Sequence, residues 1–156
     1  MLISPTGKPP RVSDKWGSGL FGASRGGIRL HAGCDYICEV NQPVIAPHDG
    51  NFFRYSFPYP NNILQGAIFT TRWGWWRVFY VMIHPEIAIQ GKRVTQGQEI
   101  GTAMDRTTQG PKPCPEMIPH VHLETWVVHR KGVLLNESNG IYEVPIDPEI
   151  MMFRKR

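Results

Sequence analysis

Short runs in which apolar and polar residues alternate recur along the chain from about residue 28. The runs are rich in β-branched and aromatic side chains, and Gly, Pro or Asn-Asn turns separate them. This pattern predicts β-strands, because such side chains favour pleated, half-buried surfaces. The expected strands are Ile28–His31, Pro43–Ala46, Gly50–Tyr55, Ala67–Arg72, Trp76–Ile83, Glu99–Ala103 and Val121–His129.

No segment has the apolar period of 3.6 residues that is typical of an amphipathic helix. Gly74 lies between two strand-like runs and predicts a hairpin, and further turns are expected around Gly91 and Gly97. The chain contains 16 Gly and 14 Pro, which excludes a long-helix or coiled-coil protein. The pattern therefore predicts a β-rich fold.

A length of 156 residues favours one domain with a substantial core. Residues 1–20 are rich in Pro and Gly and are expected to form an extended N-terminal arm over that domain. The domain itself is expected to span residues 21–131. Residues 132–156 are expected to be a loop and a basic tail packed on the same domain.

The 17 Lys and Arg residues exceed the 13 Asp and Glu residues by four, which favours an acidic partner. The basic residues are scattered and form no stripe between aromatic residues, so we expect no nucleic-acid binding. No apolar stretch approaches the ~18 residues of a membrane span, so we expect no membrane insertion. The first ten residues lack the apolar core of a signal peptide, so we expect no ordinary export.

Three cysteines cannot form a complete set of disulfides within one chain, and their redox state stays open. Cys34 and Cys38 have the opposite parity to His31 and Asp35 in an extended strand, which favours packing on the other face. A Cys/His zinc site that includes Cys114 is the alternative.

Two histidine motifs carry the candidate chemistry. His31 and Asp35 are four residues apart and face one way if the segment is extended, and His120 and His122 share one face of a strand in the same way. Each motif alone occurs often by chance, so the combination carries the argument. Two imidazoles and one carboxylate leave a fourth position open for water, which is typical of catalytic zinc.

The order of these motifs resembles that of the lysostaphin-type zinc peptidases of family M23. The resemblance covers about residues 22–130 and rests on Gly27–Asp35, Gln42–Gly50, Phe79–His84, Gly91–Gly101 and Pro119–Glu124. It implies an all-β fold, an antiparallel sheet or small barrel-like sandwich of the duplicated hybrid motif. It also implies one Zn²⁺ per chain and a site of five residues. The metal ligands would be His31, Asp35 and His122, and the catalytic pair would be His84 and His120.

The sequence departs from the family pattern in three places. Ile118 precedes Pro119 where the family has Gly, Pro85 follows the central His84, and the loop Thr107–Pro119 is longer than the usual short turn. These departures put the choice of substrate in doubt more than the chemistry. Glu124 follows the second motif, and orientation of a ligand and a structural role are equally open for it.

The resemblance implies a zinc endopeptidase that hydrolyses peptide stems or cross-links of bacterial peptidoglycan. Without an export signal, the expected setting is a phage. The protein would be an endolysin released from the host cytoplasm through a holin, or a virion-associated lysin that contacts other tail proteins; in either setting it acts on the cell wall. The alternatives are a bacterial enzyme, and a virion structural or activator protein on the same fold with little hydrolysis. The bond cut, the host and the oligomeric state stay open.

Overall fold

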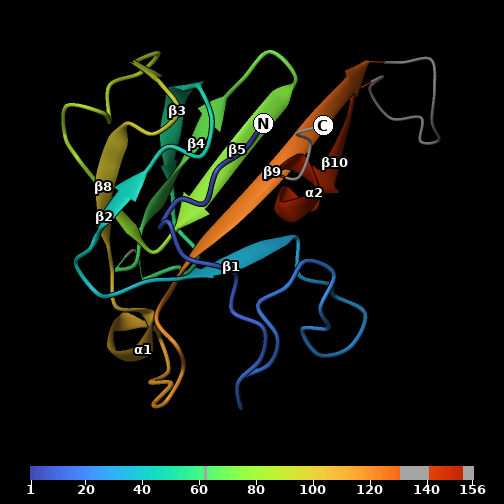
Figure 1. Cartoon of the computed structure of the whole chain (residues 1–156), viewed down its shortest axis with the longest axis vertical. Coiled ribbons are helices and arrows are strands. Elements are labelled where there is room, and N and C mark those ends of the chain that lie inside the picture. The colour runs from blue at the N-terminus through green and yellow to red at the C-terminus, as the bar shows by residue number, and fades with distance from the viewer. Residues whose placement is uncertain (62, 131–140, 153–156) are drawn as a thin grey trace.

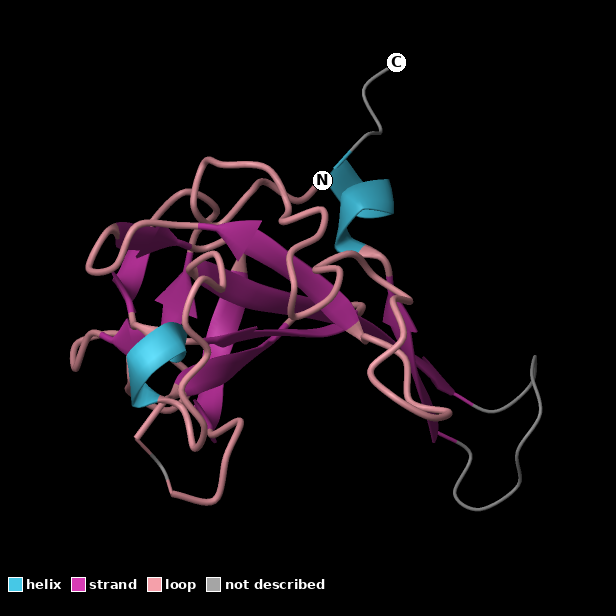
Figure 2. Cartoon of the chain, turned by 90° about the horizontal axis from the view of Figure 1, so that it is seen from below, coloured by secondary structure: helices cyan, strands magenta, loops and turns pink. Residues whose placement is uncertain are grey.

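The computed structural model describes residues 1–61, 63–130 and 141–152. Within these residues, antiparallel strands make up the body of the molecule, and two short helices lie at its periphery (Figures 1 and 2). The strands are β1 (Gly33–Ile37), β2 (Pro43–Ile45), β3 (Gly50–Ser56), β4 (Gly66–Thr70), β5 (Gly74–Phe79), β6 (Val81–Ile83), β7 (Arg93–Val94), β8 (Glu99–Ala103), β9 (His120–Arg130) and β10 (Ile141–Ile146). The helices are α1 (Arg106–Gln109) and α2 (Pro148–Met152).

The strands form two sheets. The larger has the order β1-β9-β5-β4-β3-β7, and the smaller has the order β2-β8-β6. The long strand β9 is central, because β5 covers one of its edges while β1 and β10 follow one another along the other edge. The N-terminal half of β9 is therefore enclosed between β1 and β5, and this half carries the His-x-His motif.

Strand alternation divides β9 between the core and a second, polar face. Val121 and Leu123 are fully buried in a hydrophobic cluster that also contains Trp76 of β5 and Ile100 of the smaller sheet. Because successive side chains in a strand point to opposite faces, the intervening residues of β9 face away from this cluster. The core thus fixes which side chains of β9 are available for chemistry.

The N-terminal segment lies along the outer edge of β1. The backbone N–H of Arg11 donates to the carbonyl oxygen of Asp35 at 2.7 Å, and the N–H of Asp35 donates to the carbonyl oxygen of Gly19 at 2.8 Å. A Cβ on Gly19 would lie 2.8 Å from the Cβ of Asp35, so only glycine allows this close approach. The segment covers the edge of β1 and brings the Arg11 side chain to Asp35.

The predicted β-rich, antiparallel architecture is confirmed. Gly74 lies at the β4–β5 hairpin, and Gly91 and Gly97 lie at turns with φ angles of 77° and 84°. No helix within the described residues is long and apolar enough to cross a membrane.

Two predicted strands were placed wrongly. Residues 28–31 are not a strand, because this segment folds back on residues 22–25, with His31 N–H donating to Ala23 and Gly22 N–H donating to His31. The strand begins two residues later, at Gly33. The predicted strand Trp76–Ile83 is interrupted at Tyr80, whose φ of 65° directs the chain from the larger sheet into the smaller one.

The prediction of a loop after residue 132 was wrong for residues 141–152. Here β10 pairs with the second half of β9, with Ile146 opposite Thr125, and α2 follows. The local sequence, with Pro145 inside the strand, gives weak evidence for β10, and the strand forms because β1 leaves this part of the β9 edge free. Residues 131–140 and 153–156 lie outside the described part.

Candidate metal centre

Cross-strand pairing brings the two sequence motifs together. Asp35 of β1 lies opposite His122 of β9, and Phe79 of β5 lies opposite His122 on the other side. Directly paired residues of antiparallel strands point to the same face, so all three side chains lie on the polar face of the sheet. His31 reaches the same place from the loop before β1.

Three ligand atoms converge here. His31 Nε2 lies 2.9 Å from His122 Nδ1 and 3.2 Å from Asp35 Oδ1, and His122 Nδ1 lies 2.9 Å from Asp35 Oδ1. All three residues are buried. Ligand atoms about 2.0–2.1 Å from a tetrahedral zinc ion are ~3.3 Å apart, so this triangle fits zinc with small adjustments.

The hydrogen bonds on the far side of each ring select the tautomer that a metal requires. His31 Nδ1 lies 2.9 Å from the carbonyl oxygen of Leu20, which can only accept, so Nδ1 carries the proton and Nε2 keeps its lone pair. His122 Nε2 donates to Glu124 Oε1 at 2.9 Å, which directs His122 Nδ1 to the metal position. Glu124 is itself held by Arg77 at 2.6 Å and by the Trp126 indole N–H at 2.8 Å.

The charges of the centre also favour a cation. Burial raises the pKa of the Asp35 carboxyl, but its contacts with the imidazoles of His122 and His31 outweigh burial and hold that pKa well below the usual range. Burial lowers the pKa of His122, but its bonds to Asp35 and Glu124 raise it on balance to about 9. Without a metal, His122 therefore holds a proton between two carboxylates. A metal ion would take the place of that proton.

Two guanidinium groups hold the second oxygen of Asp35. Arg11 lies 2.9 Å and Arg25 lies 3.3 Å from Asp35 Oδ2, and Arg11 also contacts Asp14 at 2.7 Å. Arg11 is only 2% exposed, so this is an interior ion pair. The arrangement orients Asp35 so that Oδ1 points to His31 and His122.

His120 lies beside the triangle. Its Nδ1 donates to the carbonyl oxygen of Ile118 at 2.8 Å, which leaves the lone pair on Nε2, 3.9 Å from Asp35 Oδ2. Burial lowers the pKa of His120, so the ring favours its neutral form. The edge-to-face contact with Tyr80, at 5.3 Å between ring centroids, holds the ring from the side. His120 is therefore placed to accept a proton at Nε2.

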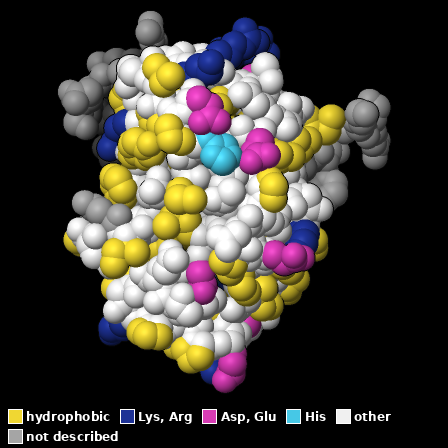
Figure 3. Space-filling view, turned by 90° about the vertical axis from the view of Figure 1, so that its left-hand side faces the viewer, with side chains coloured by type: hydrophobic (Ala, Val, Ile, Leu, Met, Phe, Trp, Pro, Cys, Tyr) yellow, Lys and Arg dark blue, Asp and Glu magenta, His cyan; other side chains and the backbone are white. Residues whose placement is uncertain are grey.

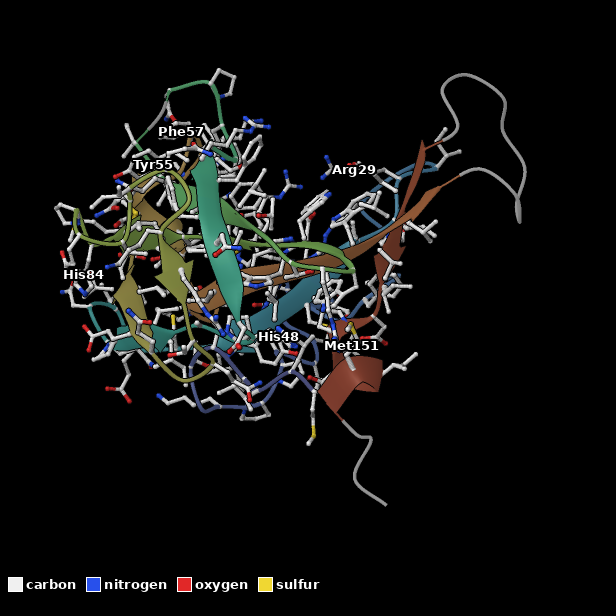
Figure 4. All side chains as sticks on the ribbon, turned by 90° about the horizontal axis from the view of Figure 1, so that it is seen from above. Arg29, His48, Tyr55, Phe57, His84 and Met151 are labelled. Carbon is white, nitrogen blue, oxygen red and sulfur yellow. The ribbon has the colours of Figure 1, made fainter. Side chains whose placement is uncertain are left out.

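The structure does not bring His84 to this centre, and its expected partnership with His120 needs correction. His84 Nε2 contacts Glu99 at 2.9 Å on the surface, and the pocket around His120 does not include it. The physical reason is the turn at Tyr80, after which β6 pairs with β8 and its end points away from the larger sheet. In Figure 4, His84 lies at one edge of the molecule, away from Arg29. Figure 3 shows the face at that edge, where a histidine side chain is exposed between acidic side chains.

The cysteines and tryptophans lie away from the metal centre or around its periphery in the part of the chain that the structure describes. Cys34 and Cys38 are buried and free, on the core side as expected from their parity. Among the described residues no cysteine joins the candidate metal group. Trp76 lies in the core, Trp75 stacks on Trp126, and Trp73 lies against His48 at a second, smaller surface pocket.

Sequence reasoning missed Arg11, Arg77 and Tyr80. Arg11 belongs to a segment without periodicity, so its burial against Asp35 could not be predicted. Arg77 lies opposite Glu124 across β5 and β9, a pairing that depends on long-range register. Tyr80 directly follows the β5 run, and only its positive φ turns it toward His120.

The centre opens into a pocket of about 820 Å³. Segments 11–32, 57–59, 77–80 and 106–124 contribute its walls, and α1 lies at the same end of the molecule as the segment before β1 (Figure 1). The pocket is large enough to accept several residues of an extended peptide.

The family model for peptidase family M23 matches residues 29–137. Myeloid protein 1 of Gallus gallus is 32% identical over 117 residues, which are 73% of this chain and 34% of that protein. Peptidoglycan DD-endopeptidase ShyC of Vibrio cholerae is 27% identical over 142 residues, which are 90% of this chain and 28% of that protein. The chain thus spans about a third of the length of these curated relatives.

Solved structures share the fold. The catalytic domain of lysostaphin from Staphylococcus simulans gives a TM-score of 0.56 at 19% identity, covering 87% of this chain and 90% of that chain. A peptidase M23 from Pseudomonas aeruginosa gives 0.57 at 14% identity, covering 100% of this chain and 52% of that chain. With the family match over most of the β-sheet region, including all three candidate ligands, the chain belongs to peptidase family M23.

Proposed function

We propose that this protein is a zinc endopeptidase that hydrolyses peptide bonds in bacterial peptidoglycan. The observation that carries the proposal is the buried triangle of His31 Nε2, Asp35 Oδ1 and His122 Nδ1, with His120 beside it. Family membership and the similarity to a peptidoglycan endopeptidase support the substrate class. The excess of four positive charges suits an anionic wall.

His31, Asp35 and His122 would hold one zinc ion. When bound, zinc supplies Lewis-acid chemistry that activates water near neutral pH and polarises a peptide carbonyl. The other side chains orient the metal ligands and transfer protons. Glu124 and the Leu20 carbonyl oxygen keep the two ligand imidazoles in the required tautomers.

His120 is the proposed general base. Its neutral Nε2 accepts a proton from the water that attacks the scissile carbonyl, and it returns that proton to the amine that leaves. Its Nδ1–H stays bonded to the Ile118 carbonyl oxygen and keeps the ring in place during both transfers. Such a group contributes about 10²- to 10⁴-fold to the rate.

A second function is a metal-bound binding or activator module with little hydrolysis. The observation that favours it is the position of His84, because the pocket holds one of the two histidines expected to act on the substrate. This alternative keeps the metal centre and differs only in turnover.

One experiment separates these functions. The metal content of the purified protein is measured, together with the turbidity loss of Gram-negative cells stripped of their outer membrane, with and without a chelator. One zinc per chain and lysis that the chelator stops would support the hydrolase. Bound zinc without lysis on several wall types would support the binding module, and absence of bound zinc would contradict both. The phage setting, as endolysin or virion-associated lysin, stays a prediction; detection of the chain in purified virions would test the second form.

A further inference from the structure

The pocket around the candidate metal centre is lined by many more cationic than anionic side chains. Among the described residues its two acids are Asp35 and Glu124. The basic residues that line it are Arg11, Arg25, Arg29, Arg77, Arg106 and Lys112. These are six of the 17 Lys and Arg residues of the chain, gathered on one pocket.

Some of these cations are already neutralised by the acids of the centre. Arg11 and Arg25 contact Asp35, and Arg77 contacts Glu124 at 2.6 Å. Arg29, Arg106 and Lys112 have no carboxylate within ion-pair distance in the part of the chain that the structure describes. Three positive charges on the pocket wall are therefore available to a ligand.

Arg106 is connected to the reacting groups through a chain of aromatic contacts. Its guanidinium lies 5.1 Å from the centroid of the Tyr59 ring, and the Tyr59 hydroxyl lies 3.4 Å from that of Tyr80. Tyr80 in turn makes an edge-to-face contact with His120. The contact with Tyr59 restrains the guanidinium, whose planar fork of N–H donors matches the geometry of a carboxylate.

Arg29 lines the same pocket from a different segment of the chain. It belongs to the segment that folds back before β1, two residues from the ligand His31, and its side chain is exposed. In Figure 4 Arg29 stands at the surface, unlike the buried Arg11.

We propose that this pocket selects peptides that carry a free carboxylate close to the bond that is cut, and that Arg29 and Arg106 bind this carboxylate. The inference rests on the proposed function, which supplies a peptide substrate. A neutral peptide would leave the cations of the pocket walls uncompensated beside a divalent ion, whereas a carboxylate compensates them. Carboxylates are side-chain or terminal groups in peptide stems. The proposed substrate is therefore an acidic stem peptide rather than a neutral cross-bridge.

The test compares two probes that differ in this group alone. Purified Gram-negative sacculi are used untreated or after their carboxylates are converted to amides with carbodiimide and ammonium chloride. Cleavage of both by the zinc-loaded protein is followed at about 0.15 M salt, where charges farther apart than about 8 Å are screened. Binding is measured separately with the zinc-loaded His120→Ala variant, which should turn substrate over about 10²- to 10⁴-fold more slowly.

Untreated sacculi should bind about five- to tenfold more tightly than amidated ones, in KM and in binding to His120→Ala. Arg29→Gln with Arg106→Gln should remove this preference, so that KM and binding for untreated sacculi come within about twofold of those for amidated sacculi. Arg54→Gln is the matched control, because it removes one exposed charge from β3 outside the pocket. It should keep the preference.

The possible failures are distinguishable. Equal cleavage and equal binding of the two probes would overturn the carboxylate preference and leave the hydrolase intact. A preference that survives the double substitution, or that Arg54→Gln abolishes equally, would overturn the assignment to Arg29 and Arg106. A binding preference without cleavage of any sacculi would contradict the proposed function and support the carboxylate site.

Discussion

Asp35 and His122 face each other as a cross-strand pair of β1 and β9, with Asp35 Oδ1 2.9 Å from His122 Nδ1. This pairing joins residues 87 positions apart in the sequence. Because strand register sets it, neither side chain needs to move far to meet a metal. The centre is thus built on the most enclosed part of the larger sheet, with only His31 supplied by a loop.

Substitution of a metal ligand and substitution of the general base should have different effects on zinc content and activity. His31→Ala or His122→Ala should lose zinc, because only two of the three protein ligands would remain. His120→Ala should keep one zinc per chain and lose about 10²- to 10⁴-fold in activity. Metal analysis and cell-wall turbidity measure the two properties. Lysis that survives His120→Ala would remove the general base from the proposed mechanism.

Glu124→Gln should weaken zinc binding about 10- to 100-fold, because the charged acceptor that orients His122 Nε2–H is lost. Competition with a chelator of known affinity measures this. Glu99→Gln is the control, since Glu99 contacts only the half-buried His84 among the described histidines. An unchanged zinc affinity in Glu124→Gln would mean that packing alone orients His122.

Gly33→Ala should disturb the pairing of β1 with β9. A Cβ at Gly33 would collide with the carbonyl oxygen of Leu123 and lie 2.9 Å from Glu124 Cγ. We expect a loss of about 2 kcal/mol in the free energy of unfolding and weaker zinc binding. Gly97→Ala has open space and a φ of 84°, so it should lower stability through backbone strain alone and leave zinc affinity unchanged. Denaturant unfolding and metal competition, measured on both variants, distinguish the two effects; equal zinc affinity would contradict the steric account.

His84→Ala should leave zinc content unchanged and activity within about twofold of the parent, because surface substitutions away from a site have small effects. The exposed contact with Glu99 contributes little. Tyr80→Ala is the informative comparison, since it removes the ring that packs on His120. A large loss of activity in His84→Ala would show that the segment after β6 rearranges around the substrate.

Much of the centre follows from the sequence because strands have a period of two. His120, His122 and Glu124 had to share one face, opposite Val121 and Leu123, once β9 was recognised as a strand. The family resemblance named His31 and Asp35, and the structure brings them to His122.

Only the tertiary structure decided which other side chains meet this face. Arg11 reaches Asp35 because the N-terminal segment covers the β1 edge, and Arg77 reaches Glu124 through the register of β5. His84 is excluded by one residue, Tyr80, whose positive φ sends the chain into the second sheet. Local pattern determines which face of a strand a residue occupies, whereas long-range pairing and single backbone angles determine what that face meets.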